Sequence, residues 1–115
     1  MRVSIVLICK VFKNRLINVL SNQESNDLPS FDLVDNTDID VQINNFLLTK
    51  LNLMSNWLDI KLFTCKVIDG VLNIFYSTWV PECYLNKEIK YLDLSDFKNE
   101  ILSHEIANSL IIKPY

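Results

Sequence analysis

Residues 28–53 read LPSFDLVDNTDIDVQINNFLLTKLNL, and this stretch carries the strongest structural signal in the chain. Thr37 to Asp40 resembles a helix capping box, with an acidic residue three positions after the threonine. Apolar residues then recur at helical spacing, at Ile39, Ile43, Phe46, Leu47 and Leu51. The stretch therefore predicts an amphipathic helix over residues 38–51. A short extended segment over residues 28–34 precedes it, and Pro29 marks this segment as an edge or a loop.

Strand patterns lie on both sides of this helix. Residues 3–11 are apolar on both faces, which predicts a central strand covered on both sides. A turn at Lys13-Asn14 and a second strand over residues 15–20 complete a hairpin. Residues 57–67 and 71–80 predict two further strands, joined by Asp69-Gly70, the strongest hairpin signal in the chain.

The remaining residues complete the predicted architecture. A short strand over residues 91–94 and a C-terminal helix within residues 95–111 follow the second hairpin. Strands that are apolar on both faces need helices on both sides of their sheet. The order of elements therefore predicts an α/β (α+β) sandwich built on a mixed β-sheet. A chain of 115 residues fits one domain, so we expect residues 1–115 to form a single domain.

Composition excludes several classes of function. Gly70 is the only glycine, which rules out the glycine-rich phosphate loops of P-loop and Rossmann proteins. A net charge of -3 and a pI of about 5.0 argue against nucleic-acid binding. The three cysteines and His104 lack the spacing of a zinc site or a disulfide framework, which indicates a reducing, intracellular compartment. No stretch reaches the ~18 apolar residues of a membrane span.

The usage of residues also hints at the source of the chain. Thirteen Asn and thirteen Ile stand against one Ala and one Gly. This bias is typical of an AT-rich coding genome, such as that of a phage or another virus, and it implies no mechanism.

The order of elements and the stretch over residues 28–53 resemble the Nudix hydrolases. Leu28-Pro29 matches the Leu-Pro that ends a strand in that family, and an ungapped register continues into the box G-x5-E-x7-R-E-U-x-E-E-x-G-U, where U is aliphatic. Leu47 and Leu53 then fall on the two aliphatic positions of the box. The Asp69-Gly70 hairpin and residues 76–82 (YSTWVPE) are similar to the later strands of the family. The resemblance implies a Nudix-like α/β/α sandwich.

The same register shows that the residues for the family's chemistry are absent. Phe31 and Asn52 stand at the two glycines, Thr37 at the first glutamate, Asn45-Phe46 at the Arg-Glu pair, and Thr49-Lys50 at the Glu-Glu pair. In the family these glutamates hold magnesium, which needs oxygen ligands and polarises a diphosphate. The resemblance therefore implies a degenerate box with no catalytic residue, no metal site and no cofactor. We expect a chain that is not an enzyme.

Other carboxylates offer two alternatives for a metal site. The pairs Asp38 and Asp40, and Asp32 and Asp35, suit a metal by residue type, but acids at a helix N-terminus and in a solvated loop explain them better. A hydrolase that takes its ligands from elsewhere in the chain would use Glu82 and Glu88.

The candidate site residues are those that could contact a ligand or a partner. Helical spacing favours core packing for Phe46, while the resemblance places this residue in the family's cleft. The aromatic residues that follow the hairpin could stack on a nucleobase, although strand alternation predicts that Phe75 and Tyr76 pack on opposite faces of the sheet. The full set of ligand or interface candidates is Phe31, Phe46, Lys50, Trp79 and Tyr84.

Two functional hypotheses follow from these residues. The first is a catalytically inactive Nudix-like domain that acts as a protein-interaction module, either a subunit of a larger assembly or an inhibitor that binds a host protein. The alternative is a non-catalytic binder of a nucleotide such as ADP-ribose or a dinucleotide. Lys50, Lys61 and Lys66 are the cations available to its phosphates.

Overall fold

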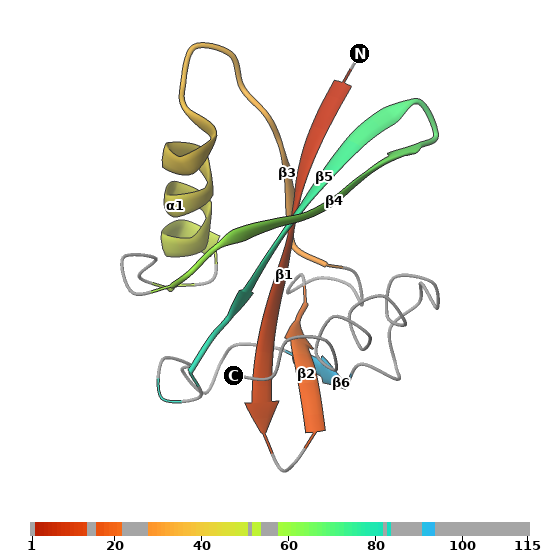
Figure 1. Ribbon diagram of the computed structural model, residues 1–115. Coiled ribbons are helices and arrows are strands. Elements are labelled where there is room, and N and C mark those ends of the chain that lie inside the picture. Colours follow the sequence, from red (N-terminus) through yellow and green to blue (C-terminus); the bar gives the residue numbers. More distant parts are fainter. Residues whose placement is uncertain are drawn as a thin grey trace.

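The computed structural model describes residues 2–13, 16–21, 28–50, 52–53, 58–81, 83 and 91–93. Within these ranges a helix lies beside a twisted sheet, as Figure 1 shows. The elements in chain order are β1 (Arg2–Lys13), β2 (Leu16–Leu20), β3 (Ser30–Asp32), α1 (Ile39–Lys50), β4 (Lys61–Ile68), β5 (Val71–Trp79) and β6 (Tyr91–Asp93). Among the residues that the structure describes, no helix is long and apolar enough to cross a membrane.

The sheet is mixed and has β1 near its centre. The strand order is β4-β5-β1-β2-β6, and β3 also pairs with β1. β1 runs parallel to β5 from Arg2↔Val71 to Lys10↔Trp79 and antiparallel to β2 and β3. β3 pairs with Ser4–Val6 of β1, and β2 with Lys10–Lys13, so the two short strands share the edge of β1 that faces away from β5. The predicted mixed sheet is confirmed.

Two predicted hairpins form as the local sequence indicates. Ile68 pairs with Val71 across Asp69 and Gly70, whose φ angles of 52° and 77° are both positive, as a two-residue turn of type I′ requires. In the first hairpin Lys13 pairs with Leu16. The prediction of a turn at Lys13 is therefore wrong, because this residue still belongs to β1.

The main core lies between α1 and one face of the sheet. Alternate residues of β1 point toward the helix, and Ile5, Cys9 and Val11 are fully buried there against Ile43 and Leu47. The other face carries a second buried cluster, formed by Val6, Ile8, Val19, Leu28 and Phe75. Both faces of β1 are buried, as predicted. The expected C-terminal helix falls outside the described residues.

The helix begins one residue later than the capping-box prediction placed it. The amide of Gln42 donates to the carbonyl of Asp38 at 3.1 Å, so Asp38 and not Thr37 is the N-cap residue. The Gln42 side chain then ties the preceding loop to the helix. Its amide nitrogen donates to the carbonyls of Val34 (2.8 Å) and Thr37 (2.9 Å), and its oxygen accepts from the Val34 amide (2.9 Å).

Two other segments differ from the predictions. The strand expected from residue 57 begins at Lys61. Asp32, interpreted as a solvated loop acid, is the last residue of β3, and its Oδ1 accepts from Nε and Nη2 of Arg2, each at 3.0 Å. This ion pair joins the two strands at an exposed edge.

The backbone after α1 explains how the chain tolerates the missing box glycine. Asn52, at the position of that glycine, has a φ of 53°. Asn is among the few residues other than glycine that adopt this left-handed conformation at modest cost. The amide of Leu53 donates to the Leu47 carbonyl at 3.0 Å, and Leu53 is buried in the core.

Replacing Gln42 tests how the loop is held. Gln42→Ala removes three hydrogen bonds, and we expect a loss of about 1–2 kcal/mol, because each bond has a small net value at an exposed site. Gln42→Glu retains the acceptor for the Val34 amide and loses both donors, so it should be similarly destabilising. Urea denaturation measures both effects. A loss below ~0.3 kcal/mol in both variants would contradict the role of Gln42.

Cys9 should give the protein a measurable sensitivity to alkaline pH. Burial raises the pKa of the Cys9 thiol from 9.0 to about 12. Above pH 9 the unfolded chain therefore releases this proton while the native chain keeps it. The free energy of unfolding then falls by ~1.4 kcal/mol per pH unit.

The comparison with Cys9→Ala isolates this contribution. Between pH 8 and pH 10.5 the wild-type chain should lose about 2 kcal/mol more than the variant, measured by urea denaturation. The variant is less stable at pH 8 because it leaves a small cavity, but other titrating groups affect both chains equally. Equal losses in the two chains would show that Cys9 does not titrate as proposed.

Candidate functional site

Two of the predicted site residues meet beside α1. Phe31 lies on β3, where it pairs with Ile5 of β1, and Phe46 lies on α1. The two rings stack with their centroids 4.9 Å apart and an interplanar angle of 30°. Both side chains are half-buried and pack against the core. Phe31 stands at the first glycine of the box and Phe46 at one of its glutamates, so these two positions of the box are in aromatic contact.

The other positions of the box do not provide a metal site. Thr37 is exposed before the helix, and Thr49 and Lys50 are exposed in its last turn. The Thr49 hydroxyl donates to the Asn45 carbonyl at 2.7 Å. Within the described ranges, no group of three or more His, Cys, Asp or Glu side chains could hold a metal ion. Thr49, Lys50 and Phe46 supply no carboxylate, so these positions do not fit the magnesium ion that family members hold there.

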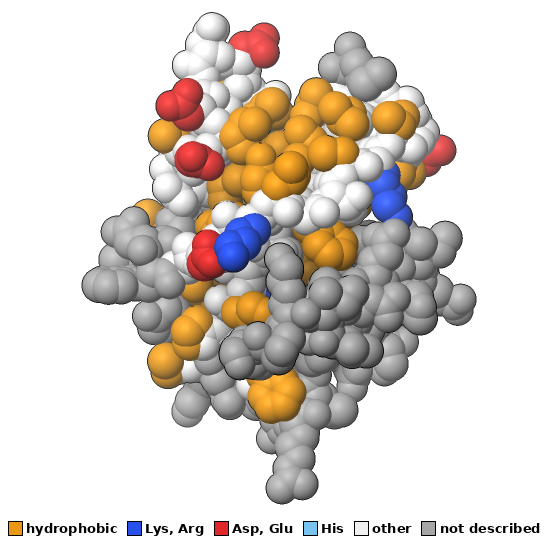
Figure 2. All heavy atoms as spheres, viewed as in Figure 1, with side chains coloured by type: hydrophobic (Ala, Val, Ile, Leu, Met, Phe, Trp, Pro, Cys, Tyr) orange, Lys and Arg blue, Asp and Glu red, His pale blue; other side chains and the backbone are white. Residues whose placement is uncertain are grey.

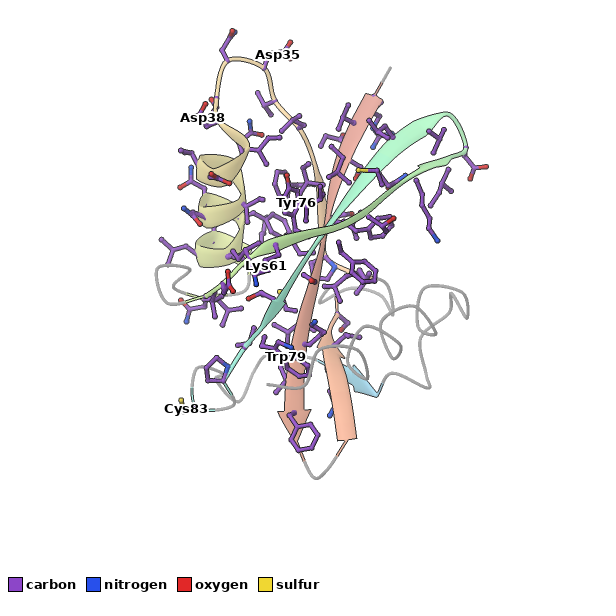
Figure 3. The ribbon with its side chains drawn as sticks, viewed as in Figure 1. Asp35, Asp38, Lys61, Tyr76, Trp79 and Cys83 are labelled. Carbon is purple, nitrogen blue, oxygen red and sulfur yellow. The ribbon has the colours of Figure 1, made fainter. Side chains whose placement is uncertain are left out.

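Trp79 lies apart from the Phe31–Phe46 stack. It pairs with Lys10, which alternates along β1 with Cys9 and Val11 and therefore points away from α1. The Lys10 ammonium lies 4.8 Å from the centre of the Trp79 ring, a cation–π contact. Figure 3 shows Trp79 far along β5 from Tyr76. Tyr84, Glu82 and Glu88 lie outside the described residues.

The lysines available to a nucleotide do not form a cluster. Lys50 ends α1, while Lys66 pairs with Asn73 and so faces away from the helix. The Lys61 ammonium lies 3.2 Å from a carboxylate oxygen of Asp59. The sheet therefore separates Lys50 from Lys66, and one phosphate group cannot contact both.

An apolar surface extends from the helix over the β4–β5 hairpin. The strand register places six side chains on the α1 face of the sheet in three cross-strand pairs: Leu62 with Tyr76, Cys65 with Ile74, and Val67 with Leu72. Leu62 is 60% exposed and Val67 is 62% exposed. We call these six residues the apolar strip. Figure 2 shows hydrophobic side chains gathered between α1 and the hairpin, with acidic side chains along the helix side.

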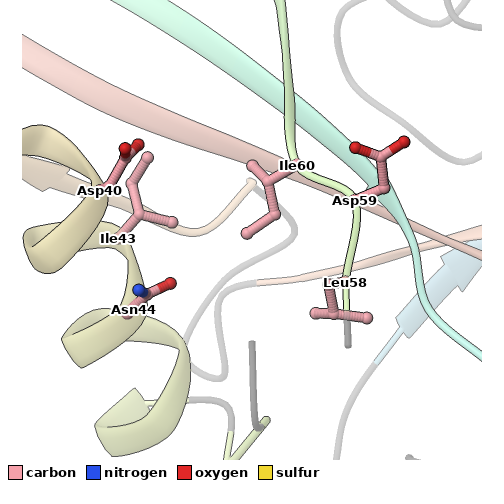
Figure 4. Close-up of a pocket in the computed structure, with 6 residues that line it drawn as sticks. All are labelled: Asp40, Ile43, Asn44, Leu58, Asp59 and Ile60. Carbon is pink, nitrogen blue, oxygen red and sulfur yellow. The ribbon is translucent and has the colours of Figure 1, made fainter. Parts of the chain in front are cut away.

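A pocket of about 350 Å³ lies where α1 meets the segment before β4. Asp40, Ile43 and Asn44 line it from the helix, and Leu58, Asp59 and Ile60 from the other side. In Figure 4, Ile60 extends toward α1, whereas the carboxylate of Asp59 points away from the helix. Burial, the negative charge of Asp40 and that of Cys65 raise the pKa of Tyr76, in that order of importance. The Tyr76 hydroxyl is thus within electrostatic reach of Asp40.

The pocket and the Phe31–Phe46 stack lie on different flanks of the helix. At 100° per residue, Asp40 and Asn44 fall on one side of the buried Ile43, and Phe46 falls on the other. The pocket was not predicted, because Asp40 and Asp59 are far apart in the sequence. The alternation of Leu58, Ile60 and Leu62 was the only signal that this segment joins the α1 face.

The fold is shared with solved structures of Nudix proteins. A mutT/nudix family protein from Listeria innocua superimposes with a TM-score of 0.73 at 12% identity, covering 96% of this chain and 94% of that one. The C. elegans Ap4A hydrolase gives 0.65 at 13% identity, covering 98% and 99%. The Nudix domain of Shewanella oneidensis NrtR, solved with ADP ribose, gives 0.63 at 10% identity, covering 94% and 87%.

These likenesses establish the fold of this chain. Neither a family model nor a curated protein matches its sequence. The chain has the Nudix-like fold that the register over residues 28–53 predicted, and at 10–13% identity the comparison shows the fold alone.

A double-mutant cycle tests the energy of the Phe31–Phe46 stack. We expect Phe31→Ala and Phe46→Ala to destabilise the protein by about 1–3 kcal/mol each, since both rings are only half-buried. The double variant should lose about 0.5–1.5 kcal/mol less than the sum of the single losses, which is the usual coupling of an aromatic pair. Strictly additive losses in urea denaturation would show that the rings do not stabilise each other.

Proposed function

We propose that this chain is a Nudix-fold protein that does not hydrolyse nucleotides and that acts by binding another protein. One observation carries the proposal: an aromatic stack occupies the positions where the resemblance puts a box glycine and a magnesium-binding glutamate. Phenylalanine supplies no oxygen ligand, and Lys50 next to the site would repel a divalent cation. Chemistry that depends on bound magnesium has no support at this site.

The apolar strip supports the binding role. A hydrophobic surface that stays exposed beside a charged rim is typical of a protein-interaction site. Leu62 and Val67 could be polar at no cost to the core, since more than half of each side chain is exposed. The partner we propose is a protein segment with apolar side chains that covers this strip.

Hydrolysis assays test the loss of catalysis. Purified protein with magnesium or manganese should release no product from ADP-ribose or diadenosine tetraphosphate above the rate without protein. Glu82→Gln serves as the control for contaminating enzymes and for ligands from elsewhere in the chain. Metal-dependent hydrolysis that Glu82→Gln abolishes would overturn the proposal.

Co-purification from the source organism or infected host tests the binding role. A C-terminally tagged wild-type chain should retain a partner protein in stoichiometric amount, and Leu62→Glu combined with Val67→Glu should release it. Val41→Glu is the matched control, because Val41 is an exposed apolar residue on α1 outside the strip. Retention of the partner by the strip variant, or loss of it in Val41→Glu, would count against the strip.

A second candidate function is the binding of a nucleotide without hydrolysis. It is favoured by one observation, the likeness to the Shewanella oneidensis domain that was solved with ADP ribose. Such a binder should be stabilised by about 2.7 kcal/mol at a ligand concentration a hundredfold above the dissociation constant. The protein-binding proposal instead expects no change of melting temperature with ADP-ribose. A saturable rise would favour the second candidate.

A further inference from the structure

We propose that two copies of this chain pair along the outer edge of β4, as antiparallel strands centred on Cys65. β4 is the end strand of the described sheet, and within the described part of the chain only β5 pairs with it. In Figure 1 the β4–β5 hairpin extends away from α1, toward the opposite side of the view. The outer edge of such a strand carries backbone N–H and C=O groups that can pair with another strand. This inference goes beyond the proposed function and does not depend on it.

Cys65 lies at the middle of the ladder that β4 forms with β5. Seven residues of β4 pair with β5, and Cys65 is the fourth of them. The seven are Lys61, Leu62, Thr64, Cys65, Lys66, Val67 and Ile68. Phe63 is the extra residue of a bulge, because the register shifts between Leu62 and Thr64. β4 therefore has three pairing residues on each side of Cys65, and a two-fold axis at Cys65 lets all seven pair with a second copy.

This register joins the apolar strips of the two copies. Opposite residues of antiparallel strands point to the same face of their sheet. Cys65 meets Cys65 of the second copy, and Leu62 meets Val67, so all three strip residues of β4 find strip residues opposite them. Leu62 and Val67 are more than half exposed in one chain alone, and pairing removes part of this apolar surface from water.

The two lysines of β4 exclude the neighbouring registers. In the register centred on Cys65, Lys66 meets Thr64 of the second copy and Lys61 meets Ile68. A two-fold axis at Lys66 would set two copies of this side chain opposite each other, and an axis at Thr64 would set Lys66 opposite Lys61. Like charges directly opposite each other destabilise a strand pair. Each shifted register also pairs only five residues of each strand.

This self-complementarity favours a second copy over a strand of another protein. The register with the largest number of pairs is also the one in which apolar residues meet apolar residues and no two lysines are opposite. The strip remains on the α1 face of the joined sheet, where another protein can still cover it. The proposed dimer therefore doubles the length of the apolar surface that is open to a partner.

Measurement of the molar mass under reducing conditions tests the dimer. In sedimentation velocity the mass should rise with protein concentration from 13.4 kDa toward twice this value. An interface made by one strand edge is smaller than the standard interface of roughly 1,600 Å², so the dimer should dissociate on dilution. A mass of 13.4 kDa at every concentration up to the solubility limit would overturn the proposal.

Paired charges test the register. Leu62→Glu combined with Val67→Glu sets like charges opposite each other twice across the axis, so it should weaken the dimer at least about tenfold. Leu62→Glu combined with Val67→Lys sets opposite charges at the same positions and should restore the dimer. Both side chains are more than half exposed, so the two variants leave the core unchanged. Equal weakening in the two variants would overturn the register.

Oxidation of Cys65 gives a second test of the register. Directly opposite residues of antiparallel strands have Cα atoms about 4.5–5.5 Å apart, a distance that a disulfide can span. Diamide takes two hydrogen atoms from the two thiols and becomes a hydrazine while the S–S bond forms. In a Cys83→Ser background, which removes the other exposed cysteine, diamide should convert the protein to a covalent dimer.

Moving the thiol by one residue provides the matched control. Cys65→Ser combined with Thr64→Cys, in the same Cys83→Ser background, should cross-link at least about tenfold more slowly, because residue 64 does not meet itself across the axis. Equal rates of cross-linking at the two positions would show random collision and would overturn the register.

The charge-swapped variant separates this proposal from the proposed function. Leu62→Glu combined with Val67→Lys should keep the dimer and lose the partner protein, because it changes the strip without preventing strand pairing. A chain that dimerises but retains no partner would overturn the binding function and leave the pairing of β4 standing. A chain that retains a partner but stays monomeric would overturn the pairing and leave the binding function standing.

Discussion

The burial of β1 on both faces and along both edges is the constraint on which the structure depends. β1 pairs with β5 on one edge and with β2 and β3 on the other. Ile5 and Cys9 are buried toward α1, and Ile8 is buried toward the opposite face. Burying one large aliphatic side chain contributes about 1.5–3 kcal/mol, so this strand carries a large share of the hydrophobic stabilisation.

Lys10 is a charged residue that lies buried on this central strand. Within the described part of the chain it is the one charged side chain in the buried set. Its aliphatic stem lies within the sheet surface while its ammonium lies over the Trp79 ring. Trp79 therefore has a structural role on the face away from α1. The strand register places Trp79 on this face, whereas Phe31 and Phe46 pack against the core on the α1 side.

The helix is attached to this sheet in a way that does not need the charged residues of a Nudix box. Gln42 holds the incoming loop, Asn52 adopts the left-handed backbone after the last turn, and Phe31 stacks on Phe46. Clustered carboxylates repel one another unless a cation lies between them. An apolar stack avoids that repulsion. The fold is thus compatible with an altered box because its core uses Ile43 and Leu47, on the face of α1 that points to the sheet.

Local signals in the sequence were enough to predict most of the described elements and the family resemblance, although not all of their bounds. Asp69-Gly70 specified its hairpin because a two-residue turn needs two positive φ angles, and the spacing from Ile39 to Leu47 specified the helix. Strand alternation correctly placed Phe75 and Tyr76 on opposite faces of the sheet. The ungapped register also put Phe31 and Phe46 at related positions of one motif, and the two rings are in contact.

Contacts between distant parts of the chain needed the tertiary structure. Alternation placed Leu58, Ile60 and Leu62 on one face, but it could not show that the helix covers Ile60 and leaves Leu62 exposed. The pocket between α1 and residues 58–60 likewise exists only because these two distant parts of the chain pack side by side. Periodicity reports which side chains share a face of one element. How far a neighbouring element extends over that face depends on packing between residues remote in sequence, which no local pattern encodes.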